Sequence, residues 1–216
     1  MVEVAMNTPP KFVLAIESAI AGGSISLLND GSEVASWVGT STVSKAEDIL
    51  ANIDTLLKSN RISLDEIGLI AVSAGPGSFT GIRIGIATAL GLKAGLSVSL
   101  SSDSALKAMA FSGPDARDIT AAVPVGRNAV CIQTFDKAGG EVTAGGEPRT
   151  ISVEMFTSLV RKQKDANFVL YNCLYKEIEP NENVVDFGSN IAYFVGQLCR
   201  INPGIVTAPL FIPKSF

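Results

Sequence analysis

A glycine-rich apolar segment is the feature that most constrains how this chain can fold. Residues 75–95 read GPGSFTGIRIGIATALGLKAG, which predicts a tight turn followed by a helix. Gly81, Gly85 and Gly91 lie inside that helix, where each glycine costs about 1 kcal/mol of helix propensity relative to alanine. Close contacts must offset this cost, and a helix that is apolar on nearly every side must be covered on nearly every side. We expect one side to lie on the chain's own sheet and the other on a second protein.

Size and charge narrow the class of protein. The 216 residues, 47% hydrophobic and 18% charged, suffice for one large domain or two small ones with an ample core. The formal net charge of -4 gives no general attraction to nucleic acid or to an anionic membrane, so any RNA must be held mainly by another subunit. Residues 1–10 do not resemble a signal peptide, and no apolar run reaches the length needed to cross a bilayer. We therefore expect a cytoplasmic protein.

The absence of histidine removes several kinds of active site. Without it the chain cannot build a histidine metal site, a Ser-His-Asp triad or a histidine general base. Cys131, Cys173 and Cys199 are odd in number, widely spaced and free of any CxxC pair, which favours reduced core cysteines over disulfides or zinc ligands. No serine or cysteine has an identifiable activating base, so we expect neither peptidase activity, nor a metal site, nor a catalytic residue.

The order of predicted elements indicates two similar halves. In the first half we predict strands at 11–17, 24–28, 33–38, 69–73 and 97–100, a hairpin turn at 29–31, and helices at 46–57, 63–67, 78–95 and 103–111. Ser44 and Glu47 fit a capping box at the start of the first helix, and Gly95 is expected to end the glycine helix in a left-handed cap.

The second half repeats this order after a boundary at Gly113-Pro114-Asp115. We predict strands at 119–124, 129–135, 168–171 and 184–187, a loop or hairpin tip at 136–148, and helices at 152–162 and 189–200. Strands followed by alternating helix and strand, twice over, predict an α/β fold of two tandem ribonuclease-H-like lobes in the actin-like ATPase (ASKHA) architecture. We place the N-terminal lobe at 1–112 and the C-terminal lobe at 113–216.

The segment 75–95 resembles the TsaB (YeaZ) family of bacterial tRNA threonylcarbamoyladenosine synthesis. The strand before it, the hairpin 23–38 and the helix 46–57 fall in the family's order, so the resemblance covers about the first 110 residues well and the rest loosely. It implies a non-catalytic scaffold that binds and activates a TsaD-like transferase together with a TsaE-like ATPase. It also implies that tRNA is reached through the complex, and it leaves self-dimerisation open.

The resemblance further implies that the first-lobe helices form a helical bundle with the partner. Gly81, Gly85 and Ala89 follow an i, i+4 ridge on which another helix can approach closely. Packing of this ridge on the chain's own sheet is the alternative. Under the partner hypothesis, Gly85→Leu abolishes association and leaves the isolated fold intact. The candidate interface residues are Ile49, Ile53, Leu56, Phe79, Gly81, Ile82, Gly85, Ile86 and Ala89.

An actin-like fold also implies a nucleotide site after the first strand. Glu17, Ser18, Gly22 and Gly23 fall there, but the family's Asp-Thr-Ser is Glu17-Ser18-Ala19 in this chain. We therefore expect a vestigial site with at most weak ATP or ADP binding and no required cofactor. The turn 75–77 lacks the lysine of a phosphate-binding loop, which favours a structural turn capped by Ser78. A stand-alone actin-like kinase or ATPase is the alternative function.

Overall fold

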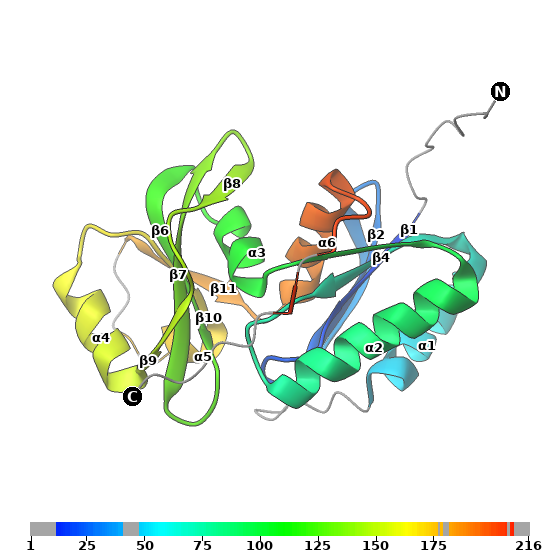
Figure 1. The fold of residues 1–216 in the computed structure, drawn as a ribbon, viewed down its shortest axis with the longest axis horizontal. Coiled ribbons are helices and arrows are strands. Elements are labelled where there is room, and N and C mark those ends of the chain that lie inside the picture. Colours follow the sequence, from blue (N-terminus) through cyan, green and yellow to red (C-terminus); the bar gives the residue numbers. More distant parts are fainter. Residues whose placement is uncertain (1–11, 41–47, 177, 179–181, 207, 210–216) are drawn as a thin grey trace.

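Two β-sheets stand side by side, with helices between them and on both outer sides (Figure 1). The computed structural model describes residues 12–40, 48–176, 178, 182–206 and 208–209. The capping box predicted at Ser44 and Glu47 lies outside the described residues.

The first sheet has the strand order β3-β2-β1-β4-β5. Its strands are β1 (Phe12–Glu17), β2 (Ser24–Asn29), β3 (Ser32–Val38), β4 (Ile67–Ser73) and β5 (Ser99–Asp103). β2 pairs antiparallel with β1 and β3, whereas β4 pairs parallel with β1 and β5. Asp30 and Gly31 both have positive φ, of 49° and 80°, which suits a tight hairpin between twisted strands and confirms the predicted turn.

The second sheet repeats the same arrangement around β6. Its order is β11-β10-β6-β7-β8, and β9 also pairs with β7. Its strands are β6 (Ala116–Pro124), β7 (Ala129–Ala138), β8 (Glu141–Ala144), β9 (Arg149–Ser152), β10 (Phe168–Tyr171) and β11 (Val184–Gly188). β6 pairs antiparallel with β7 and parallel with β10, as β1 does with β2 and β4. The predicted fold class of two tandem ribonuclease-H-like lobes is confirmed.

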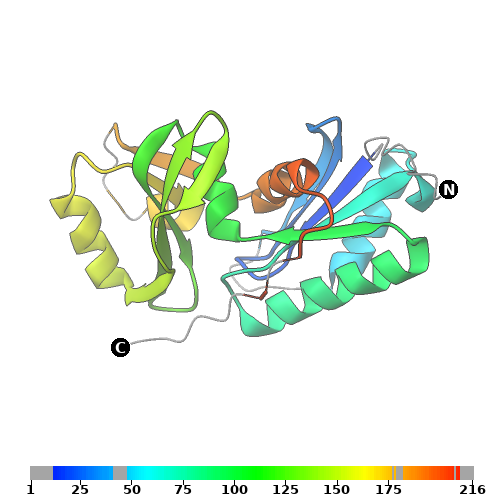
Figure 2. The same cartoon turned by 45° about the horizontal axis from the view of Figure 1, so that its top comes forward.

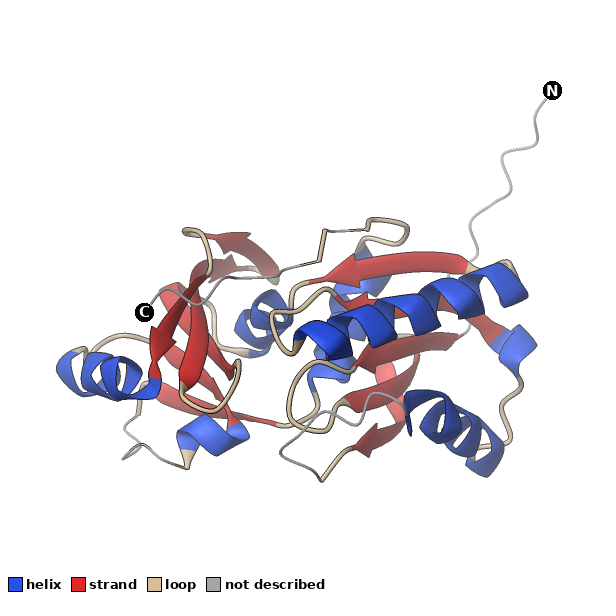
Figure 3. Ribbon diagram, turned by 60° about the horizontal axis from the view of Figure 1, so that its bottom comes forward, coloured by secondary structure: helices blue, strands red, loops and turns tan. Residues whose placement is uncertain are grey.

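Helices cover each sheet on both faces (Figure 2). They are α1 (Ile49–Ser59), α2 (Phe79–Leu96), α3 (Ala105–Ser112), α4 (Val153–Lys162), α5 (Asn172–Tyr175) and α6 (Ile191–Ile201), with a short 3-10 turn at Leu64–Glu66. α1 and α2 share an apolar core with the outer face of the first sheet, and α4 and α5 do so with the second. Figure 3 brings α2 in front of the strands that it covers.

The two inner helices are exchanged between the lobes. α3 follows β5 in the chain but packs on β6 and β7, whereas α6 follows β11 but packs on β1, β2 and β4. Gly196 of α6 lies so close to Ala15 and Leu28 that an added Cβ would come within 3.0 Å of both side chains. A single inner core therefore includes residues of both sheets and both helices. The lobe boundary between residues 112 and 113 stays a prediction. α3 comes before this boundary but covers the second sheet, and α6 comes after it but covers the first sheet.

Two local predictions are wrong, and one short helix was missed. Gly95 does not end α2; the helix continues to Leu96, and Ser97 takes the left-handed position with a φ of 54°. The loop or hairpin tip predicted at 136–148 is a hairpin tip, with the end of β7, a turn of two left-handed glycines and β8. α5 was not predicted, because four residues are too short to show a helical period. Cys131 and Cys199 are buried as expected, but Cys173 is exposed.

Candidate protein-interaction site

Three glycines of the segment 75–95 pack against one dipeptide of the same chain, Ser18-Ala19. A Cβ at Gly77 would lie 2.6 Å from the Ala19 Cβ, one at Gly81 would overlap the Ser18 carbonyl oxygen, and one at Gly85 would overlap the Ser18 Oγ. No side chain fits in any of these three spaces without movement of Ser18 or Ala19. The first part of the motif is therefore required by contacts within the chain.

Hydrogen bonds hold the turn and the dipeptide together. The Ser18 hydroxyl donates to the Gly81 carbonyl at 2.8 Å, and the Ser78 N–H donates to the Ala19 carbonyl at 2.8 Å. The Ser78 Oγ accepts from the Gly81 N–H at 3.4 Å, so Ser78 caps α2 as predicted. The turn before α2 is thus fastened to the loop after β1.

The structure places most of the predicted interface residues inside the chain. Seven are buried, Ile86 is partly buried, and Phe79 is 50% exposed. The buried seven are Ile49, Ile53, Leu56, Gly81, Ile82, Gly85 and Ala89. The glycine ridge therefore packs within its own chain and not on a partner, which is the alternative that the sequence leaves open. Because the ridge faces the Ser18-Ala19 dipeptide, the idea that Gly85→Leu would leave the fold intact is wrong.

The opposite side of α2 is open. We call it the outer face, and it consists of Phe79, Thr80, Arg83, Ala87, Leu90, Gly91 and Ala94, which recur at helical spacing and are all exposed. An open groove of about 370 Å³ runs beside it, lined by Leu50 of α1 and by Ala87, Thr88, Gly91 and Leu92 of α2. A Cβ at Gly91 would meet no atom within 4 Å.

Sequence reasoning missed the residues of this groove. Leu50 is 57% exposed although it lies in the same helix as the buried Ile49, Ile53 and Leu57. Helical spacing gives no signal for it, because Leu50 precedes the buried Leu57 by seven residues and therefore falls at the edge of the same apolar stripe. The sequence marks Gly91 as a helix-interior glycine but does not show which side of α2 it occupies.

α2 is unusually apolar for a helix with so little cover. By length and composition alone it could cross a membrane, so the expectation that no apolar run is long enough is wrong for these 18 residues. Arg83 and Lys93 are the charged residues within this run. Only 22% of its residues are buried in the structure. A large exposed apolar surface commonly marks a site where another protein binds.

The residues of the predicted nucleotide site form one tight turn after β1. The Glu17 side chain is 1% exposed, and its Oε1 accepts the N–H groups of Ala19 at 2.6 Å and Ile20 at 3.0 Å. Burial raises the pKa of Glu17 to about 8, although these two hydrogen bonds lower it. The Gly23 N–H donates to the Ile20 carbonyl at 2.8 Å, and Gly22 and Gly23 have positive φ. Nucleotide binding at this turn stays a prediction.

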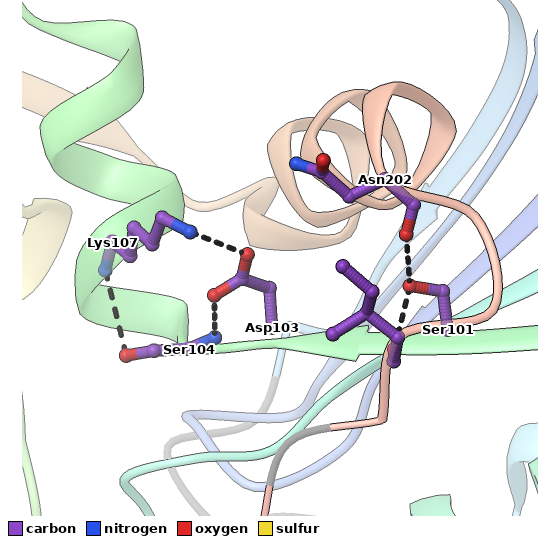
Figure 4. Close-up of polar contacts among 6 residues, drawn as sticks. Ser101, Asp103, Ser104, Lys107 and Asn202 are labelled. Atoms are coloured by element: carbon purple, nitrogen blue, oxygen red, sulfur yellow. Dashed lines mark hydrogen bonds and ion pairs between the residues drawn. The ribbon is translucent and has the colours of Figure 1, made fainter. Parts of the chain in front are cut away.

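A second polar cluster follows β5 (Figure 4). Asp103 accepts the Ser104 N–H at 2.8 Å and forms an ion pair of 2.9 Å with Lys107. The Ser101 hydroxyl contacts the carbonyl oxygens of Asn202 and Ile205, and the Ser102 N–H donates to Ile205. This cluster ties the chain after α6 to the edge of β5. Within the described part of the chain, no group of three acidic or cysteine side chains is placed to hold a metal ion.

Comparison with known proteins identifies the family. The family model described as TsaD, tRNA N6-adenosine threonylcarbamoyltransferase, matches residues 42–196. The tRNA threonylcarbamoyladenosine biosynthesis protein TsaB of Escherichia coli is 37% identical over 98 residues, which are 45% of this chain and 42% of that protein. TsaB of Haemophilus influenzae is 32% identical over 122 residues, 55% of this chain and 51% of that protein. The chain belongs to the family that the TsaD model describes. Within that family it is a TsaB (YeaZ) member. These matches span about half the length of the TsaB relatives.

Two solved structures share the fold of this TsaB-family chain. An uncharacterized protein with similarity to peptidase YeaZ, from Pseudomonas aeruginosa, superposes with a TM-score of 0.71 at 19% identity, covering 94% of this chain and 100% of that one. YeaZ from the same species gives a TM-score of 0.67 at 18% identity, covering 89% and 93%. The YeaZ fold therefore extends over both lobes, including the second half, where the sequence resemblance was loose.

Proposed function

We propose that this chain works in tRNA threonylcarbamoyladenosine biosynthesis as a subunit that binds a TsaD-like transferase and performs no chemistry itself. Support comes from the names of its TsaB relatives, from the match to the TsaD family model and from the YeaZ fold. A TsaE-like ATPase is the further partner that the resemblance implies. With a net charge of -4, the chain leaves tRNA binding mainly to the other subunits.

The uncovered outer face of α2 carries this proposal. It presents apolar and small side chains beside a groove that a facing helix could fill, and each square ångström of apolar surface so buried contributes about 25 cal/mol. A subunit that binds only the working conformation of its partner raises the population of that conformation. Activation of the transferase then needs no catalytic group from this chain.

A substitution at Gly91 tests the role of the groove. Gly91→Lys places a long charged side chain where the groove is open, and it removes a helix-interior glycine without any clash. We expect the isolated fold to be retained and co-elution with TsaD from the same organism on gel filtration to be lost. Reconstituted tRNA modification with TsaD and TsaE should fall with it, by tenfold or more.

Gly146→Lys is the matched control. Gly146 lies in the second lobe and also has open space around it, so the same residue change adds the same charge far from α2. We expect this variant to bind and activate like the unaltered chain. Equal binding by the Gly91 and Gly146 variants would contradict the assignment of the groove. ATP turnover by the chain alone, measured with magnesium present, would contradict the non-catalytic role and favour the stand-alone ATPase.

A further inference from the structure

A chain of hydrogen bonds connects a buried carboxyl group to the start of α2. The Glu17 Oε1 accepts the Ala19 N–H at 2.6 Å, and the Ala19 carbonyl accepts the Ser78 N–H at 2.8 Å. Beside this chain, the Ser18 hydroxyl donates to the Gly81 carbonyl at 2.8 Å. Ser78 is the N-cap of α2, and Gly81 lies in its first turn. The position of that first turn therefore depends on how Glu17 holds the two residues that follow it.

Glu17 and Ser18 point to opposite sides of the first sheet. Side chains alternate along a strand, and in β1 Ala15 belongs to the inner core that both lobes share, whereas Ile16 belongs to the outer core with α1 and α2. Glu17 thus lies on the inner side, and Ser18 on the side of α2. A change at the carboxyl group is passed from the inner core to the outer helix through one peptide segment.

Tyr171 of β10 is a titratable group that faces Glu17 from the second lobe. Burial raises the pKa of the Tyr171 hydroxyl, and the negative charges of Glu17 and Cys173 add to this rise. In the first sheet, Asp103 lies two strands away at the same level and is paired with Lys107 at 2.9 Å. Among the described residues, no lysine or arginine forms an ion pair with Glu17. The charge of an ionised Glu17 is therefore not compensated by a nearby cation.

Hydration is what an ionised Glu17 lacks in this position. Burial raises the pKa of its carboxyl group to about 8, even though two backbone N–H groups favour the charged form. A carboxylate with no paired cation regains favourable interactions when water reaches it. Because Glu17 is 1% exposed, water reaches it only if the turn above it opens.

The turn above Glu17 has one strained residue and one fixed end. Ala21 has a φ of 34°, a region that residues with a Cβ seldom adopt, so opening of the turn relieves strain. The far end is held at Gly23, whose N–H donates to the Ile20 carbonyl at 2.8 Å and whose carbonyl accepts the Gly39 N–H at 2.9 Å. Opening is thereby confined to residues 18–21, the part that contacts α2.

We propose that the carboxyl group of Glu17 is a proton switch that sets the position of the first turn of α2. With its proton in place, the group stays buried and holds the turn against α2 through Ala19 and Ser18. When the proton is released to solvent, water approaches the carboxylate, residues 18–21 move, and the contacts to Ser78 and Gly81 lengthen. This inference concerns the chain by itself and does not depend on the proposed function.

Nuclear magnetic resonance of the full chain tests the switch. Carbonyl carbon resonances, which do not depend on amide exchange, are recorded from pH 6 to pH 9.5. We expect the resonances of Ala19, Ser78 and Gly81 to move with one common midpoint near pH 8. Gly91 lies in the same helix but has no atom of the dipeptide near it, so it is the internal control, and its resonance should move several times less.

Two variants separate the steps of the switch. Glu17→Gln keeps an acceptor oxygen but cannot ionise, and we expect the common midpoint to be lost. Ser18→Ala removes the hydroxyl that bonds to the Gly81 carbonyl, so Ala19 should still titrate while the change at Gly81 falls several-fold. The second variant tests the connection to α2 even if the first does not fold.

Three results would overturn the switch. The first is a titration confined to Ala19, with Ser78 and Gly81 unmoved, because the proton would then act only on the turn. The second is a midpoint that persists in Glu17→Gln, which would assign the titration to another group such as Tyr171. The third is the absence of any common midpoint in the unaltered chain.

Discussion

Glu17 is a carboxyl group in an environment that disfavours its charge. It ends β1 beneath the turn that Ala19 and Ile20 begin, and burial raises its pKa from 4.5 to about 8. The folded state therefore holds a proton that the unfolded state releases above pH 4.5. Above pH 4.5, only the unfolded chain gains free energy by ionising this carboxyl group. The contribution of protonated Glu17 to the free energy of unfolding is therefore complete below pH 4.5 and is lost as the pH rises through about 8.

Replacement of Glu17 tests this pH dependence. The unaltered chain should lose stability between pH 5 and pH 8, by at most about 1.4 kcal/mol per pH unit, because native Glu17 keeps its proton. Glu17→Gln keeps an acceptor oxygen for Ala19 and Ile20 and cannot ionise, so its unfolding free energy should vary less over the same range. Urea unfolding at pH 5, 6.5 and 8 measures both curves.

The exposed carboxylate Glu154 provides the control for Glu17. Glu154→Gln removes one negative charge from the surface of α4, and its curve shows what a change of net charge does by itself. Parallel curves for the unaltered chain and Glu17→Gln would mean that the Glu17 proton is not linked to folding.

At the scale of one element, α2 has glycines with opposite roles. Gly85 faces Ser18, whereas Gly91 faces open space. Gly85→Ala should destabilise the chain by about 1–3 kcal/mol, because its methyl group displaces the Ser18 hydroxyl from the Gly81 carbonyl. Gly91→Ala should stabilise it by about 0.5–1 kcal/mol through helix propensity alone. Chemical denaturation measures the free energy of unfolding of both variants. The two variants differ only in the position at which the same methyl group is added.

The sequence predicted this helix well but not its orientation. Its cap at Ser78 follows from local chemistry, and its end is wrong by one residue. Helical spacing shows which residues share a side, but two sides of α2 carry small residues. The side that faces inward is decided by Ser18 and Ala19, about sixty residues earlier, and no local pattern contains that information. For the same reason the candidate interface included buried residues and omitted Leu50.

At the scale of the whole molecule, the exchange of α3 and α6 joins the two lobes. The strand pattern sufficed to predict two ribonuclease-H-like lobes, because each lobe repeats the order of strands and helices. The exchange could not be predicted, since the apolar stripe of α6 reads the same whichever sheet it covers. One inner core built from both halves favours unfolding in a single step.

Removal of α6 tests this coupling. A chain that ends at residue 190 leaves the inner face of the first sheet uncovered, including Ala15 and Leu28, and we expect it to lose cooperative folding. In the full chain, fluorescence of Trp37 in the first lobe and far-UV circular dichroism should report coincident urea transitions. Two separated transitions, or a cooperatively folded truncated chain, would contradict the coupling of the lobes.

The contact between the glycine ridge and Ser18-Ala19 restricts how this family of sequences can drift. Positions 77, 81 and 85 share one small volume with positions 18 and 19, so an added atom on one side has to be matched by a lost atom on the other. In a library randomised at these five positions and selected for folded protein, acceptable residues should appear as matched combinations rather than independently. The glycines of this segment would then be kept by packing inside the chain. The residues on the outer face of α2, which that packing does not restrict, would be free to change with the partner.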